Sequence, residues 1–416
     1  MKKTTLRMFR VARKTSLFLP LFAATVALAP LASLHAEEGY LFLRKHGGYQ
    51  FKVVGENFER AVPFRLKKGY PGRAYFQEPD LLILESSGRR DALLLSVYNL
   101  KTRAVKTILS PPQLNYNNYI FMLFHAATGT AVMKHLKSYK GEQLYRQGPR
   151  GRKIWFERFR KFRRNVSVQH MAPDGAYVFV HHSNKRYRGK HRPRDMRYFI
   201  PYKKWRSDVL YYRAKWKSRL RKVKTALGFY EVRLTNRGRN IVYFTPKGLD
   251  LKRKRKSYFL ESYDIQSRKL KRLGVIEQPT EYRNYGKTFR NVAYPVLRTF
   301  RNSPYVMVSP EYKKRDKKPT LFHAYNIQTG RRYEYRLPSG YRVVPGFPQA
   351  NHLSKPDTDS SYDANWPYLL LMKRSARDQT TRVIKVLRLP DFKIVREFRI
   401  QGAFKCATFI PGKPGF

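Results

Sequence analysis

The sequence predicts an all-β fold, and two patterns along the chain indicate it. Residues 383–389 and 392–400 nearly alternate apolar side chains with lysine or arginine, which is the period of a strand with one buried and one solvated face. A strand–turn–strand unit also recurs, so the strands belong to a repeated architecture. Most of the basic residues are then expected to form a solvated face, and fewer of them a binding surface.

The repeated unit has three clear copies, at residues 97–102, 262–267 and 324–330. In each copy a tyrosine-containing strand ends in polar residues, and Asn, Asp or Gly there favours the tight turn of a hairpin. A basic, apolar strand then follows, as at residues 104–109.

Four degenerate copies extend the repeat to seven equivalents. They lie near Val53, Tyr145, Val232 and Leu387. The interval from Val232 to Tyr263 is too short for four strands, so the count of repeats stays open at this point.

A second short motif, a turn with proline and glycine, precedes some of these units. It reads Met-Ala-Pro-Asp-Gly at 171–175, Phe-Thr-Pro-Lys-Gly at 244–248 and Phe-Ile-Pro-Gly-Lys at 409–413. These segments resemble the SPDG turns of TolB-type and WD-like bacterial β-propellers, where the turn joins the first two strands of a blade. The resemblance implies a β-propeller, with seven blades as the first expectation and six or eight left open.

The two ends of the chain are expected to meet in one sheet. Residues 39–44, 49–54 and 59–66 suit the second, third and fourth strands of a blade, and residues 404–410 supply the missing first strand. Such pairing closes the propeller and protects its strand edges. Cys406, the sole cysteine, is then a buried apolar residue. A β-sandwich with additions is the alternative, but it leaves the repeat unexplained.

Residues 1–36 have the composition of a secretory signal peptide. Six basic residues come first, an apolar stretch at 17–32 follows, and small residues precede a polar start at Glu37. We therefore expect a single propeller domain over 37–416, exported to the periplasm, the cell surface or the medium. The alternative, a membrane anchor, is disfavoured by the short apolar stretch and its two prolines.

A basic insertion at about 184–226 interrupts one predicted blade. Its first half contains turn-forming residues and predicts an exposed loop. In its second half Ser207 or Asp208 can cap a helix. The apolar residues Val209, Tyr212, Trp216, Leu220 and Val223 share one face of that predicted helix. This apolar stripe either packs on the rim of the propeller or rests on an anionic surface.

Charge is the main indication of function. The chain has 87 Lys and Arg against 28 Asp and Glu, and about +53 remains without the leader. A surface this basic predicts a polyanionic partner. The candidate contacts come from the insertion, from the aromatic and basic segment 150–164 and from the run 252–256, and we expect them to form one electropositive face. They are Arg152, Lys153, Arg158, Arg160, Lys161, Arg163, Arg164, Lys185, Arg186, Arg188, Lys190, Arg192, Arg194, Arg213, Lys217, Arg221, Lys222, Lys252, Arg253, Lys254, Arg255 and Lys256.

The sequence indicates no catalytic residue and no cofactor. Motifs for zinc hydrolases, serine hydrolases and phosphate loops are absent, and His181 and His182 are adjacent in a predicted strand, so they point to opposite faces. Asp357, Asp359 and Asp363 form a weak calcium candidate, because oxygen ligands recur every second residue.

The leading interpretation is an exported, non-enzymatic propeller that binds a polyanion such as lipopolysaccharide, anionic lipid, cell-wall polymer, nucleic acid or glycosaminoglycan. An anionic membrane surface is a further contact to test. The alternative is a scaffold for an acidic envelope protein, and an enzyme with a site at the mouth of a central channel is a third class.

Overall fold

In a computed structural model, most of the described residues lie in antiparallel strands. The structure describes residues 37–412 with gaps, of which the longest are 63–69, 110–118, 158–165, 187–205, 310–320 and 347–366. The predicted leader, residues 1–36, lies outside the described residues. No helix occurs in the described part, and so none there is long and apolar enough to span a membrane.

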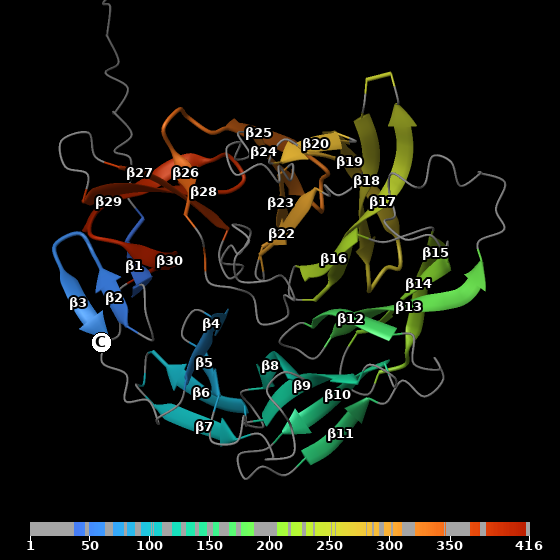
Figure 1. Cartoon of the computed structure of the whole chain (residues 1–416), viewed down its shortest axis with the longest axis horizontal. Coiled ribbons are helices and arrows are strands. Elements are labelled where there is room, and N and C mark those ends of the chain that lie inside the picture. The colour runs from blue at the N-terminus through green and yellow to red at the C-terminus, as the bar shows by residue number, and fades with distance from the viewer. Residues whose placement is uncertain are drawn as a thin grey trace, which may run out of the picture. The chain divides into compact units, whose positions relative to one another are not determined.

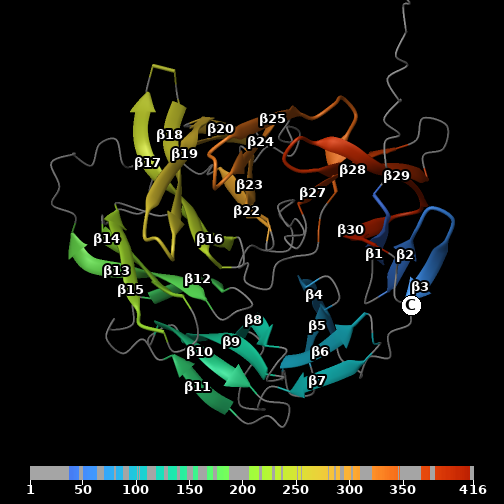
Figure 2. The same ribbon diagram turned by 180° about the vertical axis from the view of Figure 1, so that it is seen from behind.

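Within the described residues, thirty strands follow one another. Figures 1 and 2 show their arrangement from two sides. The first ten are β1 (Gly39–Lys45), β2 (Phe51–Val54), β3 (Glu59–Val62), β4 (Tyr70–Glu78), β5 (Leu81–Ser87), β6 (Leu93–Asn99), β7 (Val105–Leu109), β8 (Tyr119–His125), β9 (Thr130–Lys137) and β10 (Gly141–Gln147). The next ten are β11 (Lys153–Glu157), β12 (Val166–Met171), β13 (Tyr177–Arg186), β14 (Arg206–Arg213), β15 (Arg221–Ala226), β16 (Tyr230–Thr235), β17 (Asn240–Asp250), β18 (Arg255–Asp264), β19 (Leu270–Pro279) and β20 (Glu281–Asn284). The last ten are β21 (Lys287–Arg290), β22 (Val296–Thr299), β23 (Tyr305–Ser309), β24 (Leu321–Asn326), β25 (Arg332–Arg336), β26 (Arg342–Val343), β27 (Tyr368–Arg374), β28 (Thr381–Arg388), β29 (Lys393–Gln401) and β30 (Phe404–Pro411).

The described strands form seven four-stranded antiparallel sheets and one separate hairpin, β20–β21. Six sheets are consecutive meanders: sheet 2 (β4–β7), sheet 3 (β8–β11), sheet 4 (β12–β15), sheet 5 (β16–β19), sheet 6 (β22–β25) and sheet 7 (β26–β29). Sheet 1 has the order β3-β2-β1-β30 and joins the two ends of the chain. Repeated four-stranded meanders are the sheet organisation of β-propellers, so the structure agrees with the all-β expectation.

Sheet 1 pairs the C-terminal strand with the N-terminal strands. The register of β1 with β30 runs from Gly39 opposite Pro411 to Arg44 opposite Cys406, with an irregularity before Lys45. This is the placement that the sequence predicts for residues 404–410. Cys406 is buried, as expected.

The core lies between neighbouring sheets and is divided among several apolar clusters. Tyr212 of sheet 4 meets Tyr263 of sheet 5, with ring centroids 5.7 Å apart. On the other face of sheet 5, Tyr258 packs in one cluster with Val308 of sheet 6. Further clusters join sheet 6 to sheet 7, sheet 7 to sheet 1 and sheet 1 to sheet 2. Each sheet with such contacts on both sides therefore has two buried faces along much of its length.

The predicted repeat is the turn between the third and fourth strands of a sheet. In its three clear copies Asn99, Asp264 and Asn326 end the third strand, and their Oδ1 atoms accept hydrogen bonds of 2.7 to 3.1 Å from backbone amides two or three residues later. Left-handed residues then complete two of the turns, Arg268 with φ 58° and Gly330 with φ 81°. The Asn or Asp thus serves as a side-chain acceptor for the turn amides.

One degenerate copy of the repeat was predicted wrongly. Val53, Tyr145 and Leu387 do lie in third strands, but Val232 lies in β16, the first strand of sheet 5. The third strand of sheet 4 is β14, which contains Tyr212. With Tyr212 as the seventh equivalent, the short interval before Tyr263 disappears.

The 171–175 motif, of which only Met171 is described, falls between two paired strands of sheet 4, whereas the 244–248 motif falls inside a strand of sheet 5. Strands β12 and β13, on either side of the 171–175 motif, pair as the first and second strands of sheet 4. The 244–248 motif instead lies inside β17, where the register slips between Pro246 and Gly248. That motif is a β-bulge, and the prediction of a turn there is wrong.

The predicted helix after residue 207 is also wrong. Strands β14 and β15 occupy residues 206–213 and 221–226 and complete sheet 4, so this part of the sequence is not an insertion. Leu210 and Tyr212 are fully buried whereas Val209 and Tyr211 are half-buried, which is the period of two of a strand. The helical spacing arose because Val209 and Tyr212 of β14 were counted together with Val223 of β15, a different strand. The remaining part of the predicted insertion, residues 187–205, lies outside the described residues.

Candidate anion-binding sites

The candidate basic residues are distributed over several sheets. Lys153 lies in β11, Lys185 and Arg186 end β13, and Arg221 and Lys222 begin β15. The other candidates of sheets 3 and 4, apart from Arg213, lie outside the described residues, as do Lys254 and the calcium candidates Asp357, Asp359 and Asp363. No group of three potential metal ligands occurs in the described part of the chain.

Sheet topology divides the basic residues of sheet 4 between its two ends. Residues 187–205 connect the second strand to the third, whereas residues 214–220 connect the third to the fourth. Successive turns of an antiparallel meander lie at opposite ends of the sheet. Lys185 and Arg186 at the end of β13 and Arg221 and Lys222 at the start of β15 are therefore separated by the length of β14. An electropositive face at one end of this sheet can include only one of these two pairs.

Arg213 has a structural role in sheet 4. Its Nε donates a hydrogen bond of 2.7 Å to the Tyr177 hydroxyl, and its Nη1 donates to the Ser218 carbonyl oxygen. The side chain is half-buried. Because these bonds tie the β14–β15 turn to β13, we remove Arg213 from the candidate ligand contacts.

The basic run 252–256 lies at the tip of a long hairpin. Strands β17 and β18 pair as far as Asp250 opposite Arg255, so Lys252 and Arg253 lie in the turn between two strands of one sheet. Lys252, Arg253 and Arg255 are exposed. Asp250 is the nearby acid: its Oδ1 accepts the Arg253 amide at 3.0 Å, and its Oδ2 lies 3.7 Å from the Arg253 guanidinium.

Lys256 differs from its neighbours because it is fully buried. Its Nζ lies 5.8 Å from the centroid of the Tyr258 ring. Strand alternation turns it inward while Arg255 faces out and pairs with Glu277 at 2.9 Å. Lys256 is thus unsuited to contact a ligand in this conformation.

An aromatic ring between two cations lies nearer the middle of the same sheet. The Arg272 guanidinium lies 3.6 Å from the centroid of the half-buried Phe259 ring, and the Lys247 ammonium lies 5.7 Å from it. Each contact is a cation–π geometry. Lys247 and Arg272 are exposed, and a Glu261 carboxylate oxygen lies 3.8 Å from the Arg272 guanidinium and partly offsets its charge.

A small polar pocket lies at the opposite end of sheet 5, where it meets sheet 6. It has a volume of about 170 Å³. Its floor includes Ile327, which belongs to the apolar cluster between the two sheets. The polar lining consists of Arg239, Asn240, Ser262, Asp264, Lys269, Lys271 and Gln328. The pocket is therefore a polar opening at the edge of the apolar contact between the two sheets.

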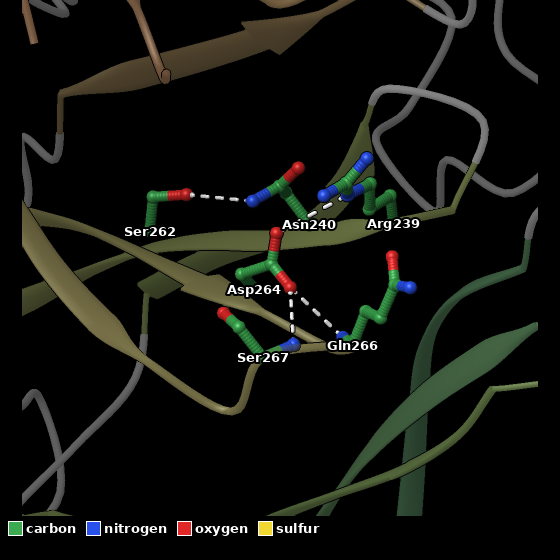
Figure 3. Close-up of polar contacts among 6 residues, drawn as sticks. All are labelled: Arg239, Asn240, Ser262, Asp264, Gln266 and Ser267. Atoms are coloured by element: carbon green, nitrogen blue, oxygen red, sulfur yellow. Dashed lines mark hydrogen bonds and ion pairs between the residues drawn. The ribbon is translucent and has the colours of Figure 1, made fainter. Parts of the chain in front are cut away.

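Asp264 organises the sheet 5 side of this pocket (Figure 3). Its Oδ1 accepts the amides of Gln266 and Ser267 at 2.9 and 2.7 Å, and its Oδ2 accepts from Arg239 Nε at 3.2 Å. Beside it, Asn240 donates to the Ser262 hydroxyl. Burial alone would raise the pKa of Asp264, but the hydrogen bonds from Ser267 and Arg239 outweigh it and hold that pKa below its usual value. The carboxylate thus stays ionised and positions the guanidinium.

Lys271 connects the two sides of the pocket. Its Nζ donates to the Gln328 carbonyl oxygen in the β24–β25 turn of sheet 6. Lys269 is exposed at the rim. The sequence analysis missed this pocket, because its residues come from two sheets. The available signal was a pair of lysines directly after the Asp-containing copy of the repeat.

Comparisons with known proteins identify no relative by sequence. No protein-family model matches the chain, and no curated protein matches it. Among solved structures, the β-propeller domain of the trilobed protease from Pyrococcus furiosus aligns with a TM-score of 0.44 at 10% identity, over 85% of this chain and 94% of that domain.

Two further structures give similar values. An apocarotenoid oxygenase from Synechocystis has a TM-score of 0.39 at 9% identity, over 91% of this chain and 93% of the oxygenase. TolB from Acinetobacter baumannii has a TM-score of 0.35 at 10% identity, over 89% of this chain and 82% of TolB. Scores this low carry no argument about the activity or ligand of this chain, whose fold and sites rest on its own strands and residues.

Proposed function

We propose that the chain is an exported, non-enzymatic β-propeller of seven blades that binds a polyanion. The seven four-stranded sheets support the blade count, and the pairing of β30 with β1 supports closure of the propeller by the C-terminal strand. The leader-like composition of residues 1–36 supports export to the periplasm, the cell surface or the medium. The net charge supports a polyanionic ligand over a neutral one.

The observation that carries this proposal is the basic tip of the β17–β18 hairpin. Three of its cations, Lys252, Arg253 and Arg255, are exposed. The hairpin is held in place because β19 pairs with β18 as far as Pro279 opposite Arg255. A rigid, charged projection loses little conformational entropy when it binds, and each cation that meets a phosphate or sulfate group releases a counterion.

We propose the segment between β13 and β14, which lies outside the described residues, as a further contact. It is the equivalent second-to-third strand connection in the adjoining sheet 4, and its sequence includes Lys190, Arg192 and Arg194. The exposed Lys247 and Arg272 of sheet 5 add positive charge beside Phe259.

The test is binding of heparin and of lipopolysaccharide by the purified protein across a sodium chloride series. We expect log affinity to fall linearly with log salt concentration. Lys252→Gln with Arg253→Gln should weaken binding and reduce that slope by about 2, because each lost contact contributes roughly 1.

A charge-matched control separates the hairpin tip from the charge of the whole protein. Lys373→Gln with Arg374→Gln removes two exposed cations at the end of β27, which precedes the corresponding connection in sheet 7. We expect this control to bind like the wild type. Equal losses in both double variants would contradict a site at the hairpin tip. Weak or salt-indifferent binding would refute the polyanion proposal and direct the search to an acidic envelope protein.

A further inference from the structure

The pocket between sheets 5 and 6 has its own charge balance. Arg239, Lys269 and Lys271 are cationic, and Asp264 is the one anion in its lining. The Asp264 oxygens already accept the two turn amides and the Arg239 Nε. The lining therefore retains an excess of positive charge and of hydrogen-bond donors.

The three cationic donors come from sheet 5, and sheet 6 supplies the Gln328 carbonyl oxygen that holds one of them. Arg239 uses its Nε for Asp264, so its terminal nitrogens are not the atoms that hold the carboxylate. Lys271 donates to the Gln328 carbonyl oxygen, and an ammonium has three hydrogens. Lys269 lies at the exposed rim. A ligand that offers several acceptor oxygens matches this arrangement.

The volume limits the size of that ligand. A pocket of about 170 Å³ exceeds the roughly 10–15 Å³ that a single water requires. It is smaller than the roughly 300–1,000 Å³ of sites that enclose a whole small molecule. The pocket thus fits one group of a few heavy atoms, with the rest of its carrier outside.

We propose that this pocket binds a single tetrahedral oxyanion, a phosphate or sulfate group, through Arg239, Lys269 and Lys271. The turn of the Asp-containing repeat positions the guanidinium, and the sheet 6 turn positions the lysine ammonium. The site lies at the end of sheet 5 opposite the hairpin tip, so it is separate from the proposed polyanion surface and does not depend on it.

Inorganic sulfate and inorganic phosphate are the probes for this site. The purified protein is titrated with each anion by calorimetry at constant ionic strength, with sodium chloride as the replaced salt. Amide resonances of Gln328 and Ser267 report binding at the pocket itself. We expect saturable binding and progressive shifts of these two amides, and Arg239→Gln with Lys269→Gln should weaken binding at least tenfold.

Two controls keep the inference open to refutation. Lys373→Gln with Arg374→Gln removes the same charge elsewhere and should leave oxyanion affinity unchanged, whereas Lys271→Gln should weaken it without disturbing the Asp264 contacts. The site would be refuted if sulfate bound no more tightly than chloride. It would also be refuted if the pocket variants and the control variant had the same oxyanion affinity. The hairpin-tip variant Lys252→Gln with Arg253→Gln should keep oxyanion binding, so failure here and failure of the polyanion proposal are distinguishable.

Two competitors then distinguish the source of the group. A sulfated disaccharide and a soluble short-chain phosphatidic acid each carry the same oxyanion on a different molecule. The one that displaces inorganic sulfate at the lower concentration identifies the carrier, and either result supports the site. Failure of both to displace sulfate would contradict a pocket that accepts a group attached to a larger molecule.

Discussion

Phe409 couples the two ends of the chain, and its removal should destabilise the fold strongly. It lies in β30 with 1% of its surface exposed. Its ring meets Tyr368 edge-on at 4.9 Å and Phe398 at 6.2 Å. Truncating a buried phenylalanine to alanine costs about 3–5 kcal/mol, a large share of the roughly 5–15 kcal/mol that stabilises a typical domain. Lys405→Ala on the same strand removes an exposed side chain and should cost no more than about 0.5 kcal/mol.

A second substitution tests whether this cost arises at the junction of β30 with β1. A methyl group added to Gly39 would overlap the Phe409 ring, so Gly39→Ala alone should cost about 1–3 kcal/mol through overpacking. Once Phe409→Ala removes the ring, Gly39→Ala should cost less than in the wild type, and the cost that remains comes from the Ile410 carbonyl oxygen, 2.8 Å from the added methyl group. The double-mutant cycle therefore predicts a coupling of at least about 1 kcal/mol.

The assay for this cycle is urea unfolding followed by fluorescence and by circular dichroism. Agreement of the two probes checks that one transition describes the fold. Strict additivity of the two substitutions would refute the packing between the chain ends. A Phe409→Ala variant as stable as Lys405→Ala would refute the burial argument altogether.

Three further outcomes follow from polar contacts. Asp264→Ala should cost about 1–3 kcal/mol in urea unfolding, because two turn amides lose their acceptor, whereas Asp264→Asn keeps Oδ1 and should cost clearly less. Folding lowers the pKa of Asp264. The stabilisation that the ionised carboxylate gives to the fold is therefore present above about pH 4 and is lost as the pH falls through the lower pKa of the folded state. The advantage of the wild type over Asp264→Ala should therefore shrink in that acidic range. For His323, burial lowers the pKa, the charge of Arg332 lowers it further, and Glu334 partly opposes them; an NMR titration should place its midpoint below 6.5, and Arg332→Gln should raise it.

The sequence predicts those parts of the fold that depend on local contacts. The turn after Asp264 and its equivalents is recognisable because one Asn or Asp side chain bonds to amides two or three residues away. Strand β29 is recognisable because Val395, Phe398 and Ile400 are buried while Arg399 between them is exposed. The pairing of β30 with β1 could be inferred because the N-terminal strands lack a fourth member.

Other features depend on contacts between distant residues. Residues 207–224 carry apolar side chains at helical spacing, yet Leu210 and Tyr212 belong to a strand because β13 and the next sheet cover them. The pocket at Asp264 requires Lys271 to meet Gln328, 57 positions later in the chain. A single sequence does not specify such a meeting, so this pocket was absent from the prediction.

Part of the positive charge has an explanation in the fold itself. Strands β25 and β29 end their sheets, and Arg332, Arg336, Lys393 and Arg399 on them are exposed. Ile394 is also exposed on β29, because a register slip opposite Leu387 turns it outward. Lysine and arginine on a terminal strand hinder pairing with a second molecule, and Lys393 is the sequence neighbour of the exposed Ile394 at such an edge. Charge at these edges therefore carries little information about a ligand. Cations that project from a hairpin tip or converge on a pocket do not protect a strand edge. The binding experiments must therefore test these cations.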